Sequence, residues 1–154
     1  MNTFRKSFWL ATGLVLSIGL VSSCTSTTAA QPISRLTEAE VRALADPMAE
    51  NLLQAMNTSD YAQYTRDFNE AFKQNLSQSA FKTINSLRIE TVGPYVSKEF
   101  WQMVQKNDKI TVAYRAKFTD DSSVIFSLYL KNIDRKWYVD GTYYDSPLMR
   151  KSGC

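Results

Sequence analysis

Two carboxylates are the side chains of this sequence that we consider for acid–base chemistry. Asp67 precedes Phe68 in an aromatic-rich stretch, and Asp140 lies in a later segment where apolar and polar residues alternate. Each carboxyl group would need burial to raise its pKa before it could act as a general base near neutral pH. The chain has no histidine, which is the usual acid–base residue at that pH. We therefore expect a protein that is not an enzyme, with Asp67 and Asp140 as catalytic candidates if it is one.

The remaining inventory argues against a metal, a cofactor or a nucleic acid as partner. The two cysteines, Cys24 and Cys154, cannot build a zinc site or a disulfide framework. The segment Asp120–Ser123 offers oxygen ligands, but it lacks the spaced acids and the glycine of a calcium loop. Without Arg5 and Lys6 the net charge falls from +3 to +1, which leaves nucleic-acid binding without an electrostatic basis.

The first 24 residues have the pattern of an export signal that ends at a cysteine. Arg5 and Lys6 give a positive start, and Phe8–Val21 is an apolar run of 14 residues before the small residues Ser22 and Ser23. As a helix, 14 residues span roughly 21 Å, whereas the apolar core of a bilayer is about 30 Å thick. Cleavage of residues 1–23 is therefore favoured over a retained transmembrane helix.

The sequence Val21-Ser22-Ser23-Cys24 resembles the lipobox of prokaryotic lipoproteins. The resemblance implies that the sulfur of Cys24 carries a diacylglyceryl group and that the mature protein begins there, anchored to the cell membrane or outer membrane and facing the periplasm or exterior. An ordinary cleaved signal is the alternative, and an unlipidated Cys24 could then form a disulfide with Cys154. Residues 24–35, rich in Ser, Thr and Ala, indicate a flexible tether.

Helical signals begin directly after this tether. The segment Thr37–Glu40 fits a capping box, and apolar residues recur at helical spacing as far as about Asn57. The stripe keeps its phase across Pro47, but this proline removes a hydrogen bond, so we expect either a kink there or a new segment that Asp46 caps and Pro47 begins.

Two further helices are expected before the period changes. Tyr61–Phe72 carries aromatic residues at helical spacing, and Ser77 is a candidate cap for a helix that Gly93-Pro94 ends. The inward positions of that last helix are predicted to be Phe81, Ile84 and Leu87.

From Tyr95 onward the period of two predicts four strands in hairpin succession. Their expected spans are 95–106, 109–119, 122–133 and 136–145. On the fourth strand Trp137, Val139, Gly141 and Tyr143 are predicted to share the inner face. The expected fold class is α+β, with about three N-terminal helices on a curved four-stranded antiparallel sheet. This domain would span residues 36–146 and be followed by a mobile tail at 147–154.

Several segments of the chain also resemble a known family. They are Ala49–Asn57, Asp60-Tyr61, Tyr64–Phe72, Val92–Tyr95 and Val112–Phe118. The family is a domain of unknown function, common in prokaryotic lipoproteins and assigned to the nuclear transport factor 2-like (cystatin-like) superfamily. That resemblance implies helices wrapped around a curved sheet as a cone, which can enclose a pocket between helices and sheet.

A pocket of that kind would be lined by large amphipathic side chains on inward faces. The candidates are Tyr64, Phe68, Trp101, Tyr114, Phe126 and Tyr143. The leading hypothesis is a lipid-anchored, non-catalytic domain of the cell envelope that binds a small apolar or amphipathic ligand or a protein partner. One alternative is an isomerase or hydrolase that uses Asp67 or Asp140 with tyrosine hydroxyls, and another is a self-associating assembly module.

Overall fold

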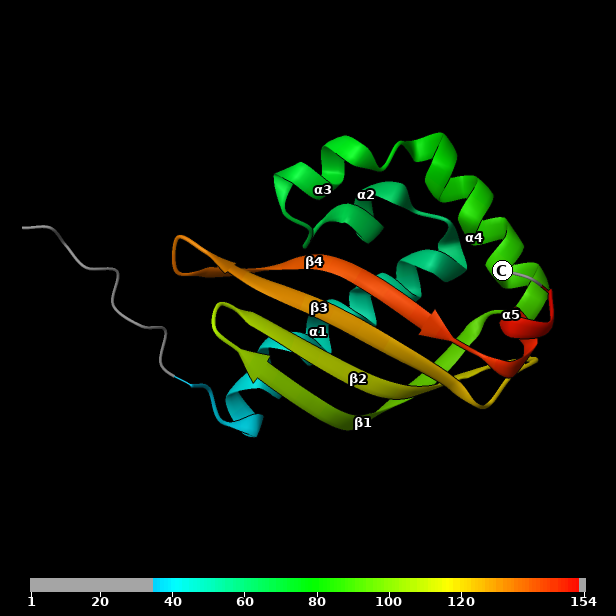
Figure 1. Cartoon of the computed structure of the whole chain (residues 1–154). Helices are drawn as coiled ribbons and strands as arrows, with labels where there is room; N and C mark the ends of the chain where they lie inside the picture. Colours follow the sequence, from blue (N-terminus) through cyan, green and yellow to red (C-terminus); the bar gives the residue numbers. More distant parts are fainter. Residues whose placement is uncertain (1–34, 153–154) are drawn as a thin grey trace, which may run out of the picture. The chain divides into compact units, whose positions relative to one another are not determined.

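The computed structural model describes residues 35–152. The predicted signal peptide, the lipidation site Cys24, nearly all of the tether and Cys154 lie outside these residues. Four helices come first, then four strands and a last helix (Figure 1). The elements are α1 Glu38–Thr58, α2 Tyr61–Thr65, α3 Glu70–Asn75, α4 Gln78–Val92, β1 Tyr95–Lys106, β2 Lys109–Phe118, β3 Val124–Ile133, β4 Lys136–Asp145 and α5 Pro147–Ser152. Within residues 35–152, no helix is long and apolar enough to cross a membrane.

Helix α1 begins at the predicted capping box. The amide of Glu40 donates to Oγ1 of Thr37 at 3.3 Å, and the amide of Thr37 donates to Oε2 of Glu40 at 2.8 Å. The helix continues through Pro47 as one element, so no second segment begins after Asp46. It ends where Ser59 adopts the left-handed conformation with φ 53°.

The prediction of a single helix over residues 61–72 is wrong, because the structure has two short helices there, α2 and α3. Between them, the backbone of residues 66–69 leaves the helical path and pairs with strand β4. The amide of Val139 donates to the carbonyl oxygen of Asp67 at 2.8 Å, and the amide of Asn69 donates to that of Val139 at 3.1 Å. Phe68 is thereby placed in the core, fully buried.

The inner face of α4 is rotated from its predicted position. Phe81, Asn85 and Val92 are buried, whereas Ile84 and Leu87 are 50% and 48% exposed. The reason is that Asn85 takes a core position, where its Nδ2 donates to the carbonyl oxygen of Met56 at 2.8 Å. The prediction assigned the inner face to apolar residues and therefore passed over this polar one.

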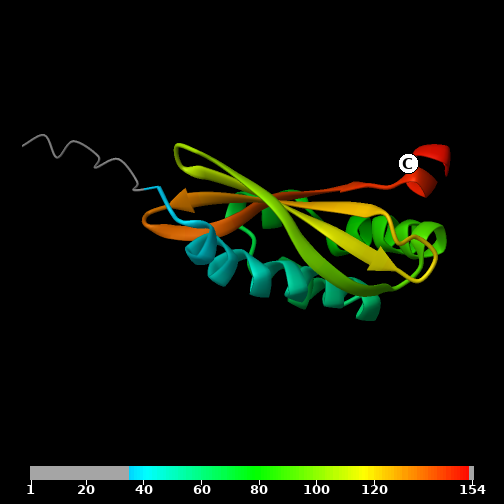
Figure 2. The same ribbon diagram turned by 90° about the horizontal axis from the view of Figure 1, so that it is seen from below.

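The sheet is an antiparallel meander in the order β1-β2-β3-β4, and the strands run as predicted to within two residues. Helix α1 lies along one face of the twisted sheet (Figure 2). The buried side chains of the two central strands alternate as expected: Ile110, Val112, Tyr114, Ala116 and Phe118 on β2, with Val124, Phe126, Leu128 and Leu130 on β3. The predicted α+β class is confirmed, with four helices rather than three before the sheet.

Register shifts reverse two side chains that were expected to face inward. Two shifts lie on β1, between Tyr95 and Ser97 and between Phe100 and Gln102, and another lies opposite Tyr129/Leu130 on β4. A bulge adds a residue and so changes which face the following side chains occupy. Trp101 is 43% exposed and Tyr143 is 56% exposed, and the inward placement predicted for both is wrong.

The C-terminal segment expected to be mobile contains helix α5. Ser146 is fully buried, and its Oγ accepts from the amides of Leu148 and Met149 at 3.1 and 3.2 Å. The Oγ–H in turn donates to the carboxylate of Asp121. Met149 is 8% exposed and belongs to the hydrophobic core, which explains why the chain stays packed beyond residue 146.

Candidate functional site

The interior between helices and sheet is filled by aromatic rings. Four of the six residues predicted to line a pocket are packed there: Tyr64, Phe68, Tyr114 and Phe126, each at most 5% exposed. The ring centroids of Tyr64 and Phe68 are 5.5 Å apart, and those of Tyr114 and Phe126 are 6.2 Å apart. Trp101 and Tyr143 are not brought to them. Whether any of the six binds a ligand stays a prediction.

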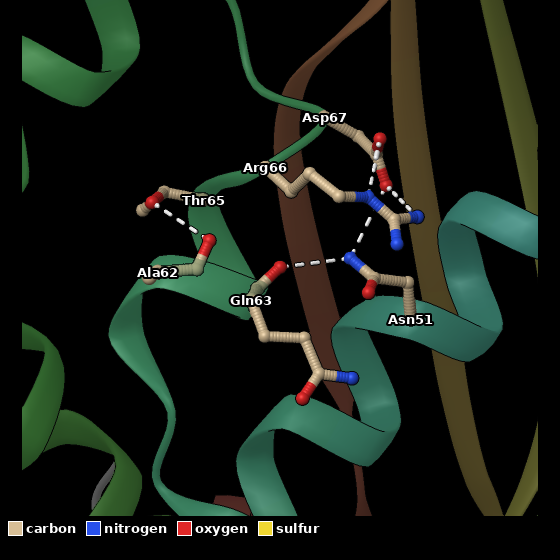
Figure 3. A network of polar contacts seen from close by, with 6 residues as sticks. All are labelled: Asn51, Ala62, Gln63, Thr65, Arg66 and Asp67. Atoms are coloured by element: carbon tan, nitrogen blue, oxygen red, sulfur yellow. Dashed lines mark hydrogen bonds and ion pairs between the residues drawn. The ribbon is translucent and has the colours of Figure 1, made fainter.

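Asp67 is held in a network of polar contacts between α1 and the end of α2. Asn51 and Arg66 both point toward its carboxylate (Figure 3). Arg66 donates from Nη2 to Oδ2 at 2.8 Å, and Nδ2 of Asn51 donates to the same oxygen at 3.2 Å. That Nδ2 also donates to the carbonyl oxygen of Gln63 at 2.8 Å. These contacts fasten the chain as it leaves α2.

Asp140 has a comparable role on β4, the strand with which the backbone of residues 66–69 pairs. Its Oδ1 accepts from Nδ2 of Asn69 at 2.8 Å, while Oδ1 of Asn69 accepts from the amide of Phe72 at 2.9 Å at the start of α3. Asp140 therefore lies at the bulge of β4 and ties it to α3. The two catalytic candidates are both engaged in contacts that position residues 66–69 against β4.

Two carboxylates of α1 that the sequence analysis missed receive hydrogen bonds from core tyrosines. Tyr114 donates its hydroxyl to Asp46 at 2.9 Å, and Tyr95 donates to Glu50 at 2.8 Å. Burial, with the nearby carboxylate, raises the pKa of each tyrosine hydroxyl above its ordinary value. Nζ of Lys98 lies 3.5 Å from Oε2 of Glu50 and forms an ion pair with it. These contacts hold α1 against strands β1 and β2.

An open groove lies between α4, the end of β4 and α5, and we call it the α4 groove. Its volume is about 180 Å³. It is lined by Ile84, Leu87, Arg88, Thr91, Tyr144 and Met149. The first four recur along α4 at positions i, i+3, i+4 and i+7, so they share one helix face. That second stripe was the sequence signal for the groove, but the analysis assigned two of its members to the core.

Arg88 is fixed in place on the wall of the α4 groove. Its guanidinium carbon lies 3.9 Å from the centroid of the Tyr144 ring, and its Nη1 lies 3.1 Å from Sδ of Met56. The hydroxyl of Tyr144 donates to the same sulfur at 2.9 Å. Burial raises the pKa of the Tyr144 hydroxyl, and the positive charge of Arg88 opposes that rise. Across residues 35–152, no carboxylate forms an ion pair with Arg88.

The described residues thus form an α+β domain, with helices packed on a four-stranded antiparallel sheet. The chain belongs to the family described as "Protein of unknown function (DUF3887)", whose model matches residues 49–135. The resemblance to a domain family of unknown function is thereby confirmed.

Two solved structures show what the chain is similar to. One is an NTF-2 like protein of unknown function from Silicibacter pomeroyi DSS-3, with 13% identity, a TM-score of 0.49 and coverage of 72% of this chain and 99% of that one. Another is an NTF2-like protein of unknown function from Pseudomonas putida KT2440, with 14% identity, a TM-score of 0.44 and coverage of 73% and 90%. Similarity at this level carries no information on ligand or activity. No curated protein matches the chain.

Proposed function

We propose that this protein is a non-catalytic binding domain of the cell envelope and that it takes a small amphipathic ligand in the α4 groove. The observation that carries the proposal is the exposure of Ile84 and Leu87, 50% and 48%, on a helix whose other face is packed. Leaving such side chains in water forgoes about 25 cal/mol for each Å² of apolar surface. A ligand with an apolar part would bury that surface.

The other walls of the groove support a ligand of mixed character. Tyr144 and Met149 add further apolar surface, whereas Arg88 and Thr91 add polar groups. Small-molecule sites commonly combine mostly apolar walls with a few placed polar groups. The two acid–base candidates, Asp67 and Asp140, do not line this groove, and their contacts described above account for them without catalysis.

The envelope location is part of the proposal and rests on the sequence Val21–Cys24. A diacylglyceryl group on Cys24 would provide two acyl chains, which hold a protein on a membrane far more firmly than one. Intact mass measurement of membrane-extracted protein tests this part. A chain that begins at Cys24 with a lipid adduct is expected, and an unmodified chain that still begins at Met1 would contradict it.

The groove is tested with an uncharged apolar fluorophore, N-phenylnaphthylamine, added to residues 24–154 that carry Cys24→Ser. We expect fluorescence enhancement in the parent protein and its loss in Ile84→Ser and Leu87→Ser. Val104→Ser is the matched control, because Val104 is 62% exposed on β1 and does not line the groove. Equal fluorescence in all four proteins, or none in the parent, would contradict the proposal.

A further inference from the structure

We infer that the α4 groove selects single-chain amphiphiles that carry a carboxylate, with Arg88 as the anion-binding residue. The inference rests on the proposed function, because it names the chemistry of the ligand for the same groove. It adds a specificity that exposed apolar side chains alone cannot provide.

The first argument is the electrostatic state of Arg88. An arginine side chain is always charged at physiological pH, and a partly buried charge is stabilised when an opposite charge pairs with it. Arg88 is partly buried, yet no acidic side chain in the described part of the chain pairs with it. The groove therefore contains a cationic group whose natural complement is an anion supplied from outside.

The second argument is the fixed position of the guanidinium. The ring of Tyr144 supports one face of it at 3.9 Å, and Sδ of Met56 accepts from Nη1 at 3.1 Å. Both supports come from the core side, since Met56 is 1% exposed. A guanidinium that is already held in place loses little side-chain entropy when an anion binds. Arg88 is thus preorganised for binding.

The third argument concerns the shape of the ligand. Guanidinium donors form a planar fork that matches the two oxygens of a carboxylate. Ile84 and Leu87 lie on the same helix face as Arg88, so a carboxylate and an attached alkyl chain can be bound together. The groove volume of about 180 Å³ lies below the 300 to 1,000 Å³ that is usual for drug-sized ligands. One alkyl chain fits this size better than a lipid with two.

The test compares two amphiphiles with the same ten-carbon chain and opposite head groups, decanoate and decyltrimethylammonium. Each is titrated below its micelle concentration into ¹⁵N-labelled residues 24–154 carrying Cys24→Ser, and amide shifts are followed by NMR. We expect decanoate to shift amides of α4, α5 and the end of β4 and to bind at least tenfold more tightly than the cation. Raising the salt concentration should reduce the difference.

Two variants assign the selectivity to Arg88. Arg88→Gln should reduce the preference for decanoate over the cation to about onefold. Arg88→Lys keeps the charge but loses the planar fork, so decanoate should bind several-fold more weakly than to the parent and still better than the cation. If Arg88→Gln does not fold, the lysine variant and the head-group comparison in the parent still decide the matter.

The outcomes separate this inference from the proposed function. Equal binding of the two head groups, with shifts in the groove and N-phenylnaphthylamine bound, would overturn carboxylate selectivity and leave a general amphiphile site. Unchanged selectivity in Arg88→Gln would also overturn the inference. Absence of groove shifts with either amphiphile, together with absence of fluorophore binding, would overturn both.

Discussion

Asn57, near the end of α1, and Tyr95, the first residue of β1, exchange two hydrogen bonds. Nδ2 of Asn57 donates to the carbonyl oxygen of Tyr95, and the amide of Tyr95 donates to Oδ1 of Asn57, both at 2.8 Å. A single amide side chain therefore acts on the strand as another backbone segment would. It fixes the position at which the chain, after three intervening helices, returns to the end of α1.

Replacing Asn57 with alanine should lower the free energy of unfolding by about 1–3 kcal/mol, because two partly buried backbone groups lose their partner. Urea denaturation monitored by circular dichroism measures the change. Asn75→Ala is the matched control, since Asn75 is exposed and its Nδ2 donates to the carbonyl oxygen of Ala71 within the same helix. The control should change stability by less than about 0.5 kcal/mol, and an equal loss in both variants would contradict this role.

Asn85 should tolerate a carboxylate poorly at neutral pH. It is fully buried, its Nδ2 donates to Met56 and to Ser59, and its Oδ1 has no hydrogen-bond partner among residues 35–152. In Asn85→Asp an ionised side chain would be buried against the carbonyl oxygen of Met56, which cannot donate, at a cost of about 2–3 kcal/mol. Burial raises the pKa of such a carboxyl group, so the folded state holds more protons than the unfolded state.

The sign of the resulting pH dependence follows from that proton uptake. The stability deficit of Asn85→Asp should be largest above the raised folded-state pKa of the new carboxyl group, and it should shrink as the pH falls from 7 to about 4, toward the ordinary carboxyl pKa. Urea denaturation of the variant and the parent at both pH values measures the difference. A deficit that is constant or grows at pH 4 would contradict burial of this side chain.

Glu50 should show the opposite dependence. Burial favours the neutral form of its carboxyl group, but hydrogen bonds from Gln54 and Tyr95 and the charge of Lys98 outweigh burial and lower its pKa. A lowered folded-state pKa stabilises the protein above the ordinary carboxyl pKa, and this stabilisation is lost as the pH falls through the folded value.

The Glu50→Gln variant should therefore be less stable than the parent at pH 7, and the difference should diminish below about pH 4. Because the Glu50 side chain is 45% exposed, the effect should be small and should weaken with added salt. The comparison requires denaturation curves at pH 7 and at about pH 3.5. Glu70→Gln is a control, since the Glu70 side chain is 80% exposed and forms an exposed ion pair with Lys73 on its own helix. A difference that is equal at both pH values would contradict the assignment.

Local signals allowed most of the fold to be predicted from the sequence. The capping box at Thr37, the stop at Gly93 and the alternation on β2 each depend on neighbouring residues, and the structure contains all three. The errors arise where distant segments meet. Asn85 is buried because the end of α1 needs a donor, and residues 66–69 leave the helix because β4 offers backbone partners. No local pattern encodes either contact.

The candidate site was missed for a related reason. Tyr143 was expected to face inward by strict alternation, but the register shift on β4 brings Tyr144 to that face instead. Its ring then lies 4.9 Å from that of Phe126 and beneath Arg88. Alternation cannot reveal a bulge, because the extra residue changes the phase without changing the composition. The stripe on α4 marks one wall of the groove in the sequence, but the contact of Arg88 with Tyr144 could be recognised only after the register of β4 was known.

Substitutions at Tyr143 and Phe126 test that register directly. Phe126→Ala removes a fully buried ring and should cost about 3–5 kcal/mol. Tyr143→Ala removes a side chain that is 56% exposed and should cost less than about 1 kcal/mol. Both are measured by urea denaturation. Similar large losses for the two variants would mean that Tyr143 faces the core and that the shift is misplaced.

Ser146 should control the wall of the α4 groove that α5 contributes. Its Oγ caps the amides of Leu148 and Met149 and donates to the buried Asp121. Ser146→Ala removes the cap, which is typically worth about 1 kcal/mol, and leaves Asp121 without this donor. Since Met149 lines the groove, loosening α5 should open that wall.

We expect faster amide hydrogen exchange at residues 148–150 and weaker binding of N-phenylnaphthylamine in Ser146→Ala. Ser122→Ala, at an exposed position, should change neither, and unaltered exchange in Ser146→Ala would show that α5 is held without its cap.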